Sequence, residues 1–528
     1  MESPGSERRS SAAGSVPSTA EDDRLTSPAT NKEPFSSQFL DGSGLATKAR
    51  QLYMKILLQR TCLIIVAMFA IFSIYWAALS HVPARSLEGW IVDFDEGRIG
   101  QTVVGQLDKF SSPALSWKVH EASDFPNGAA DLIEAVVEER CWVAVAINRG
   151  STAKLNLALA GGVTASYDGS SAITAYGIEA RNENAFRTLL RPTLDNWLNQ
   201  VSHDFAIDLF KDMASNSSIR LASITPEALV RPVYFTIQNL RPFDVPVATA
   251  VTFVGLIYLL ILSFFVVNSG IMARAASGLE RQLTLGSLIR VRMVTPVLIY
   301  LILSCFYSLV SMMFELPFDR KCVLCWIEVH NRFGRSGFLV FWMISWFGMM
   351  AAGLALESMV TLLTIKYIQI FLILWIISNV SVCLWPIDAL PKVYTYGHAA
   401  PFYQISRAVR TIVFRTKNEV GLNFGILLVW ILISCITLPV IQWYRRREEV
   451  RDWLKQRENE KGSRDFHKTE GASEADSGLL RAQAQALHAA LGSISTCYIP
   501  VGLMRASSNP VLEIASCDPI PHESPICL

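Results

Sequence analysis

The sequence predicts a multi-pass α-helical membrane protein with about six spans and an α/β or α+β extracytoplasmic domain between spans one and two. Three observations predict this fold class. Hydrophobic residues make up 51% of the 528 residues and charged residues only 18%, a composition unlike that of a soluble protein. The hydrophobic residues gather in blocks of roughly 20, the length that crosses a bilayer. Residues 81–246, between the first two blocks, instead alternate strand-like and helix-like patterns.

Six segments are apolar over the length of a span, and inside lipid each must satisfy its own backbone hydrogen bonds as a helix. They are Thr61–Leu79, Val247–Val267, Val294–Phe314, Phe338–Met359, Tyr367–Trp385 and Phe424–Trp443. The first segment follows a long polar lead, unlike the short charged lead of a cleavable signal peptide. We therefore expect it to remain as a signal anchor.

These segments divide the chain into five predicted regions. Residues 1–50 are rich in Ser, Pro, Thr and charge and lack an apolar period, so we predict a disordered cytosolic tail. Residues 51–80 hold the first span and its flank, and residues 81–246 form the extracytoplasmic mixed α/β domain. Residues 247–444 form a five-span membrane domain. Residues 445–528 are expected to be a basic flank followed by a disordered cytosolic tail.

Basic residues beside the spans predict that both termini are cytosolic, because cytosolic loops retain Lys and Arg during insertion. With six spans, three basic segments fall on one side of the membrane. They are the amino-terminal flank with Lys48, Arg50, Lys55 and Arg60, the loop with Arg274, Arg281, Arg290 and Arg292, and the carboxyl-terminal flank with Arg445, Arg446, Arg447 and Arg451. Residues 81–246 are then extracellular or lumenal, in the plasma membrane or an endomembrane. The acceptor sequon at Asn216 fits this side and makes Asn216 a glycosylation candidate.

Within residues 81–246, period-two and helix-period patterns predict the individual elements. Strands are expected at Trp90–Phe94, Cys141–Ile147, Gly162–Tyr167 and Ala172–Ile178. Helices are expected at Ile99–Leu107, Ala129–Glu139 and Glu183–Met213, the last with a kink or restart at Pro192. A domain of this size can bury its own core.

Several function classes lack their sequence signals. The formal net charge of +1 argues against nucleic-acid binding, which needs a basic excess on one face. The chain contains no phosphate-binding loop, no Gly-x-Ser-x-Gly elbow and no His-Glu-x-x-His pair, so we expect no nucleotide-binding site, no cofactor and no enzyme activity. Asp93, Asp95 and Glu96 could bind a cation through oxygen ligands, but Asp after a strand is ordinary turn chemistry and that interpretation is favoured.

Two further sets of residues are candidates for function. Cys322 and Cys325 lack the second pair that a structural zinc site needs, so we expect a local disulfide or two unconnected thiols, and no metal site. Polar side chains inside spans mark paths for solutes when they face the bundle interior. The candidates for a substrate path are Asn268, Gln369, Asn379 and Glu357. Ordinary interhelical hydrogen bonding is the alternative interpretation of this set.

Several motifs resemble the fungal nitrosoguanidine-resistance membrane-protein family. The most specific is the juxtamembrane segment Tyr234–Pro246, which runs into Val254–Leu260. Val92–Asp95 looks like the start of that family's ectodomain, and Gly348–Glu357 and Tyr396–Pro401 also match its pattern. The resemblance covers most of the chain and leaves both tails unmatched.

The resemblance implies a layout similar to that of ABC-2-type permeases, with one span, a large ectodomain and five further spans. It implies a role in tolerance of toxic compounds but supplies no catalytic or binding residues. The leading hypothesis is therefore a permease-like membrane protein that contributes to export of toxic small molecules. The alternative is a non-transporting organiser that regulates lipid distribution or other transporters. In either case we expect membrane lipids, and a second copy of the chain or a partner protein, as partners.

Overall fold

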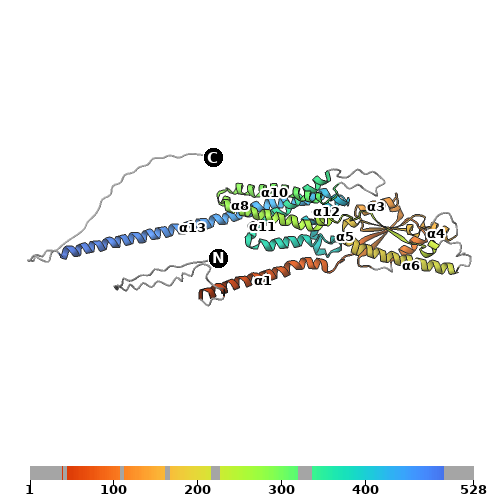
Figure 1. Ribbon diagram of the computed structural model, residues 1–528, viewed down its shortest axis with the longest axis horizontal. Coiled ribbons are helices and arrows are strands. Elements are labelled where there is room, and N and C mark those ends of the chain that lie inside the picture. Colours follow the sequence, from red (N-terminus) through yellow and green to blue (C-terminus); the bar gives the residue numbers. More distant parts are fainter. Residues whose placement is uncertain are drawn as a thin grey trace, which may run out of the picture. The chain divides into compact units, whose positions relative to one another are not determined.

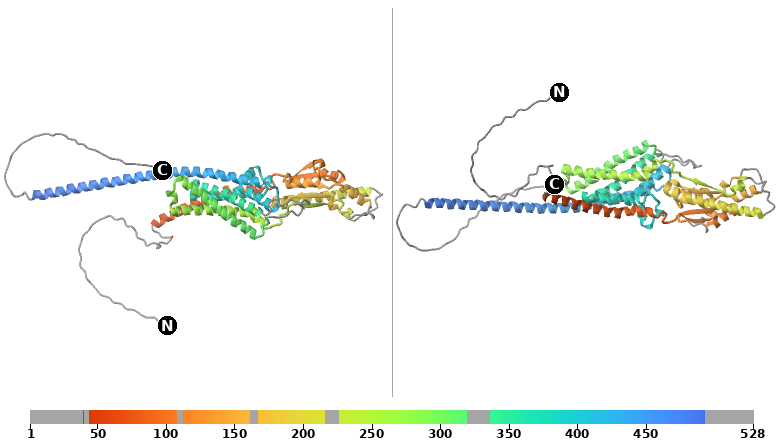
Figure 2. Two further views of the ribbon diagram at one scale, coloured as in Figure 1. Left: turned by 90° about the horizontal axis from the view of Figure 1, so that it is seen from above. Right: turned by 60° about the horizontal axis from the view of Figure 1, so that its bottom comes forward.

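The computed structural model describes residue 39 and residues 44–107, 112–160, 167–215, 226–318 and 336–492. The chain forms two compact units, Met1–Trp443 and Tyr444–Leu528. In the first unit, a mixed α/β domain lies at one end of a set of membrane helices in every view (Figures 1 and 2). It is formed by residues 81–246 and is called the ectodomain after its predicted location.

Among the residues that the structure describes, five helices are long and apolar enough to cross a membrane. Their apolar parts are Ala46–Ser80 in α1 (Gly44–Ser80), Ala250–Ser277 in η7 (Ala250–Val254) and α8 (Gly255–Ser277), Leu285–Met313 in α10, Gly337–Leu363 in α11 (Gly337–Val380) and Val420–Lys461 in α13 (Val420–Gly492). Tyr367–Val380, the last part of α11, is a shorter apolar helix. The chain is therefore a multi-pass α-helical membrane protein with a small β-sheet domain.

The contacts of α11 reverse direction along its length. Ser358 lies 3.5 Å from Thr437 of α13. Trp375 packs on Trp430, with ring centroids 5.2 Å apart, although Trp430 precedes Thr437 on α13. A straight helix would carry Trp375 about 25 Å beyond Ser358 in the direction away from Trp430, at 1.5 Å per residue. The last part of α11 therefore runs back beside the first part, as the teal segment of Figure 1 also shows.

The ectodomain contains one five-stranded sheet with the order β2-β1-β3-β4-β5. Its strands are β1 (Leu87–Asp93), β2 (Leu115–His120), β3 (Val143–Ile147), β4 (Ile173–Gly177) and β5 (Phe235–Asn239). β1 pairs in parallel with both β2 and β3, β3 pairs with β4 antiparallel, and β4 pairs with β5 in parallel. The sheet is mixed, and helices connect its parallel strands.

Both faces of the sheet are covered, which explains why β3 reads as a continuous apolar run. Val143, Val145 and Ile147 face a core that includes residues of α2 (Arg98–Gly105), α4 (Ser151–Leu159) and α6 (Arg191–Ser215). Ala144 and Ala146 face the opposite core against α3 (Ala129–Val137). All five residues of β3 are buried, since successive side chains of a strand point to opposite faces.

Most of the predicted ectodomain elements are confirmed. The predicted strands at Trp90–Phe94, Cys141–Ile147 and Ala172–Ile178 correspond to β1, β3 and β4, and the predicted helices correspond to α2, α3 and α6. The predictions omitted β2, β5 and α4. Most of the predicted strand Gly162–Tyr167 lies outside the described residues. Near Pro192 the helix does not break, but a π-helical turn, η5 (Phe186–Leu190), directly precedes α6.

The connector between α11 and α12 (Pro401–Phe414) belongs to both cores. Val382 and Leu390 lie in the core of the membrane helices, whereas Ala389 lies in the ectodomain core. The amide of Ala84, just after α1, donates a hydrogen bond of 2.8 Å to the carbonyl of Ala389. The connector therefore attaches the ectodomain to the membrane helices. Its helical turns are η9 (Ile387–Ala389) and η10 (Lys392–Ala399).

Short helices complete the described structure. They are η2 (Ala122–Asp124), η3 (Gly169–Ser171), η4 (Glu179–Arg181), α5 (Glu183–Ala185), α7 (Pro226–Val230) and α9 (Leu279–Gln282), and α10 spans Leu285–Met313.

Residues 445–492 differ from the expected basic flank and disordered tail, because α13 continues as a helix to Gly492. Residues 445–461 are mostly Arg, Glu, Lys and Gln, which are strong helix formers. Arg445 and Glu448 also pair at i,i+3 with a separation of 3.3 Å, a spacing that stabilises helices.

A substitution at Gly353 of α11 tests how closely this helix packs against α10. A Cβ atom on Gly353 would lie 2.2 Å from the Tyr300 hydroxyl and 2.5 Å from its ring, so Gly353→Ala should overpack the interface. We expect the unfolding free energy to fall by about 1–3 kcal/mol, measured by thermal unfolding in detergent. Gly425→Ala is the control, since nothing lies within 4 Å of its Cβ position. Equal stability of the two variants would contradict this packing.

Candidate functional site

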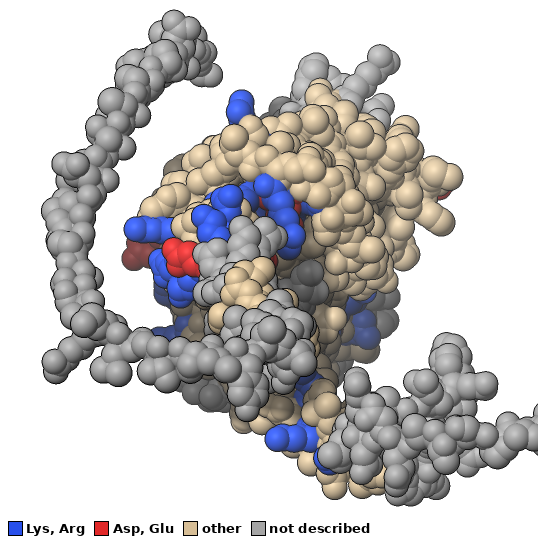
Figure 3. All heavy atoms as spheres, turned by 90° about the vertical axis from the view of Figure 1, so that its left-hand side faces the viewer, with Lys and Arg blue, Asp and Glu red and all other residues tan. Residues whose placement is uncertain are grey.

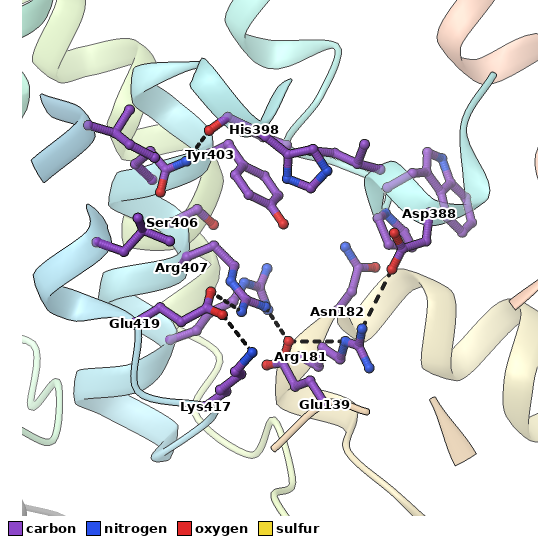
Figure 4. Close-up of a pocket in the computed structure, with 18 of the residues that line it drawn as sticks. Glu139, Arg181, Asn182, Asp388, His398, Tyr403, Ser406, Arg407, Lys417 and Glu419 are labelled. Carbon is purple, nitrogen blue, oxygen red and sulfur yellow. Dashed lines mark hydrogen bonds and ion pairs between the residues drawn. The ribbon is translucent and has the colours of Figure 1, made fainter. Parts of the chain in front are cut away.

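A polar cavity of about 320 Å³ lies where the ectodomain, the connector and α12 meet (Figure 4). Its ectodomain walls come from Glu139 and Trp142, which lie between α3 and β3, and from Arg181 and Asn182 in the segment after β4. The connector, α12 and the start of α13 provide the other walls. Those residues are Cys383, Trp385, Pro386, Ile387, Asp388, His398, Tyr403, Gln404, Ser406, Arg407, Arg410, Lys417, Glu419, Leu422 and Ile426. The cavity thus depends on the docking of two parts of the chain that are distant in sequence.

One face of α12 lines the cavity. Tyr403, Arg407 and Arg410 follow one another at intervals of four and three residues, so their side chains lie on the same side of the helix. Pro401 is at the first turn of α12, where its missing N–H is not needed. The Asn379 side chain accepts a hydrogen bond of 3.2 Å from the Phe402 amide. Asn379 therefore fixes the start of this helix.

Glu139 is the central carboxylate of the site. Its Oε2 atom lies 2.6 Å from Nη1 of Arg407 and 3.3 Å from Nε of Arg181. Its side chain is only 5% exposed, and its backbone has φ 59°, a conformation that favours Gly or Asn at the end of a helix. Because this backbone conformation favours Gly, a glutamate at the position indicates that its side chain is needed there.

A second carboxylate, Asp388 of the connector, binds the same arginine from the other side. Nη2 of Arg181 lies 3.5 Å from Oδ2 of Asp388, and the indole of Trp142 donates a 3.2 Å hydrogen bond to that oxygen. The Arg181 guanidinium also stacks on the Trp142 ring at 3.5 Å. Arg181 thus connects ectodomain and connector by charge and by cation–π contact.

Arg410 is held by a separate acid of the ectodomain. Its Nη1 atom lies 2.6 Å from Glu183 Oε2 and donates a 3.0 Å hydrogen bond to the Ala180 carbonyl. The side chains of Arg410 and Glu183 are 6% and 11% exposed. Burial alone would raise the pKa of Glu183, but Arg410 holds it below its ordinary value of 4.5.

The remaining charged residues lie just before the start of α13. Glu419 binds Arg407 and Lys417, each at 2.8 Å. Burial opposes ionisation of Glu419, yet Lys417 and Arg407 lower its pKa. Burial likewise opposes the charge on Arg407, but Glu139 raises its pKa above the ordinary value. Glu419 and Arg407 are therefore both charged at neutral pH.

The cavity also offers groups that can bind a ligand. In Figure 4 the Tyr403 hydroxyl points into the space between α12 and the connector. The Lys417 side chain is 33% exposed. Leu422 and Ile426 of α13 add an apolar wall. The arrangement presents donors, acceptors and an apolar surface together, which is suited to binding a small charged or polar group that carries an apolar chain.

The four candidates for a substrate path are not brought together. Asn379 is buried beside the cavity and also donates to the Trp375 carbonyl at 2.9 Å. Glu357 is buried and pairs with Arg274 in the last turn of α8, away from the ectodomain where that helix begins. Asn268 and Gln369 are exposed, so neither faces the interior of the helices in this structure.

The other predicted positions have simpler outcomes. The glycosylation candidate Asn216 and the candidate disulfide of Cys322 and Cys325 lie outside the described residues. Asp93 accepts hydrogen bonds from the Asp95 and Glu96 amides, and Asp95 accepts one from the Thr152 amide at the start of α4. These contacts agree with turn and capping chemistry. Over the described residues, no three His, Cys, Asp or Glu side chains are grouped to hold a metal ion.

The main site residues were not among the sequence candidates. Glu139 and Arg407 are separated by 268 positions, and Glu183 and Arg410 by 227, so no local pattern pairs them. The only local signal is the spacing of Tyr403, Arg407 and Arg410 on one helical face.

Comparisons with known proteins find a family and a yeast relative that is named as a membrane protein. Residues 61–436 match a family described as "Protein of unknown function (DUF3533)". The chain is also 27% identical over 220 residues to the Saccharomyces cerevisiae protein named "Uncharacterized endoplasmic reticulum membrane protein YJR015W". That match covers 39% of each chain, so it extends over well under two thirds of the relative. No solved structure matches the chain.

The Glu183–Arg410 pair should stabilise the docked ectodomain. Glu183→Gln leaves a buried guanidinium without its counter-charge, which should lower the unfolding free energy by about 3–5 kcal/mol. Denaturant unfolding of the purified full-length protein measures this change. Glu448→Gln is the control, because its pair with Arg445 is 37–38% exposed and should contribute less than about 1 kcal/mol. Similar losses in both variants would contradict the buried role of Glu183.

The same pair predicts a pH dependence. Because the pKa of Glu183 is lower in the folded protein than its ordinary 4.5, its stabilising contribution is complete above pH 4.5. It is lost as the pH falls through the folded value. The difference in unfolding temperature between the unsubstituted protein and Glu183→Gln should be constant from about pH 7 to pH 5 and shrink below about pH 4.5. A difference that grows on acidification would reverse this sign.

Proposed function

The chain belongs to the DUF3533 family, and we propose that it is a permease-like membrane protein that binds amphiphilic molecules at the junction of its ectodomain and membrane helices. The observation that carries the proposal is the cavity between Glu139, Arg181 and Arg407. Its charged groups suit a polar head, and its apolar wall suits the attached chain.

The size and border of the cavity indicate which part of a ligand it holds. Its volume of about 320 Å³ is at the lower end of the roughly 300–1,000 Å³ of small-molecule pockets. It fits a head group better than a whole amphiphile. Leu422 lines the cavity and is also 60% exposed on α13, so the cavity borders the surface that would face lipid. An acyl chain could therefore stay in the bilayer while its head enters the site.

The proposal includes six crossings of the membrane. The reversal of α11 between Ser358 and Trp375 supports two crossings by that segment, in addition to the other four long apolar helices. Six crossings put both termini on one side and the ectodomain on the other. Arg281 lies in α9 and Arg290 near the start of α10, so both follow the end of α8 that is farther from the ectodomain. Figure 3 shows Lys and Arg side chains gathered on the face that it views. This supports a cytosolic location for that end.

Two comparisons support the cellular role. The resemblance to the nitrosoguanidine-resistance family and to ABC-2-type permeases supports export of, or tolerance to, toxic small molecules. The yeast relative is named as a protein of the endoplasmic reticulum, which supports an endomembrane location with a lumenal ectodomain. The proposed activity is binding and movement of a ligand and not catalysis, with energy supplied by a partner protein or a gradient.

A second function is favoured by a specific observation. Asn268 and Gln369 are exposed, and Glu357 and Asn379 lie at separate places, so the polar residues of the spans do not line one path. A protein that binds lipid heads at the junction and organises the bilayer, without moving ligands across it, would need no such path.

Cells with and without the protein separate these functions. We expect cells that lack the protein to retain more of several fluorescent toxic amphiphiles, with unchanged distribution of labelled lipids between leaflets. Expression of other exporters must be matched. Equal retention of the amphiphiles together with altered lipid distribution would contradict export and favour the organiser.

A point variant connects the activity to the cavity. Tyr403→Phe removes the hydroxyl that points into the cavity and should reduce export by roughly two- to tenfold, the effect of one lost hydrogen bond. Tyr258→Phe makes the same chemical change at a residue that is 56% exposed on α8 and should leave export unchanged. Equal effects of the two variants would place the ligand elsewhere.

A further inference from the structure

Four helices meet in a buried polar network near the end of the membrane helices opposite the ectodomain. Glu357 of α11 is 1% exposed, and its Oε1 atom accepts from Nη2 of Arg274 in α8 at 2.9 Å and from Nε of Arg292 in α10 at 2.7 Å. Arg292 also donates to the Thr361 hydroxyl at 2.6 Å and to the Gln442 side chain of α13. We call these five residues the Glu357 network.

The network connects α8, α10, α11 and α13 through side chains. Each of α8, α10 and α13 contributes a side chain. Arg274 of α8 and Arg292 of α10 bind the Glu357 carboxylate, and Gln442 of α13 binds Arg292. Charged groups at such depth are costly unless they are paired, so the three helices are held together while Glu357 is paired. Glu280 of α9 acts electrostatically on Arg274 and offsets part of the second positive charge.

The network is nevertheless incompletely satisfied. The Oε2 atom of Glu357 and the Nε atom of Arg274 are buried without a hydrogen-bond partner among the described residues. Buried polar atoms of this kind are rare and raise the free energy of the state that contains them. A rearrangement that hydrates them would recover part of this cost. The closed arrangement is therefore less strongly favoured than a fully satisfied cluster would be.

The layer next to the network is closely packed. The Tyr300 side chain fills the space against Gly353, one helical turn from Glu357, and its hydroxyl donates to the Ser263 carbonyl at 3.3 Å. Tyr300 is fully buried. The membrane helices are thus closed at the end that holds the network, whereas the ligand-sized cavity described above lies at the ectodomain end.

We propose that the Glu357 network is a gate that closes the cytosolic end of the membrane domain. This inference rests on the proposed permease function and its orientation. Opening requires Glu357 to separate from Arg274 and Arg292, which frees α8 and α10 from α11. The gate opens when ligand binding or a partner favours the hydrated arrangement.

The test measures opening without measuring transport. Ser358 is 1% exposed, and its hydroxyl accepts a hydrogen bond from the Thr437 hydroxyl of α13. A cysteine at position 358 therefore reports access to the α11–α13 interface. Full-length Ser358→Cys protein is embedded in vesicles with its proposed cytosolic side outward. It is treated with a membrane-impermeant maleimide, and labelling at position 358 is quantified by peptide mass spectrometry.

A gate predicts faster labelling when the network is broken. Adding Glu357→Gln should raise the labelling rate by roughly tenfold or more, as expected for a shift in the population of an open state. Adding Arg274→Met, which keeps the Glu357–Arg292 pair, should raise it by a smaller factor. Glu183→Gln is the matched control for general loosening, since it breaks a buried Glu–Arg pair at the ectodomain end and should raise the rate far less than Glu357→Gln does.

The outcomes distinguish the gate from a structural clamp and from failure of the proposed function. If Glu357→Gln and Arg274→Met lower the folded yield while the folded fraction labels at the original rate, the network is a clamp and the gate is overturned. An increase with Glu183→Gln equal to that with Glu357→Gln would also overturn it, because general loosening would then explain the labelling. Selective faster labelling in a protein that exports no amphiphile would support the opening and contradict the permease function alone.

Discussion

Docking of the ectodomain on the membrane helices depends on the pairing of charges that are removed from water. Glu139 lies between Arg181 and Arg407, and Arg410 lies on Glu183. A buried charge without its partner is far more costly than an exposed one, so the end of α3, the segment after β4 and α12 must take up their positions together. The cavity exists only because these elements meet, which makes the ion pairs a condition for the site as well as for the fold.

The same constraint acts at both ends of the membrane helices and is relaxed between them. At each end, arginines of one element meet a carboxylate of another, whereas the buried face of α10 between the ends carries Tyr300, Ser304 and Ser308. The hydroxyls of the two serines are satisfied within their own helix. Small side chains allow close helix approach, but they do not specify which helices pack together. The ionic contacts at the ends therefore determine which helices are neighbours, and the small residues determine how closely they pack.

Local patterns in the sequence predict what depends on neighbouring residues and fail where distant residues decide. The apolar blocks and the buried run of β3 were predictable, since length and period alone define them. β2 was missed because its burial alternates only weakly and most of its residues are exposed or half-buried, and β5 because it lies inside a segment that reads as a span flank. The pairing of Glu139 with Arg407 has no local signal at all, because only the docked structure brings them together.

Backbone conformation provides a further reason to regard the junction as functional. Glu139 and Arg415 both adopt positive φ although neither is glycine, and they follow α3 and α12, two helices at the junction that holds the cavity. The Arg415 carbonyl accepts a hydrogen bond of 3.3 Å from Arg241 of the ectodomain, and Glu139 holds Arg407. Glycine would satisfy the backbone at both positions with less strain. Sequences depart from such local preferences mainly at functional or strained sites. The junction combines two of these departures with a charged, ligand-sized cavity, and an ectodomain that needed only to be attached would require neither.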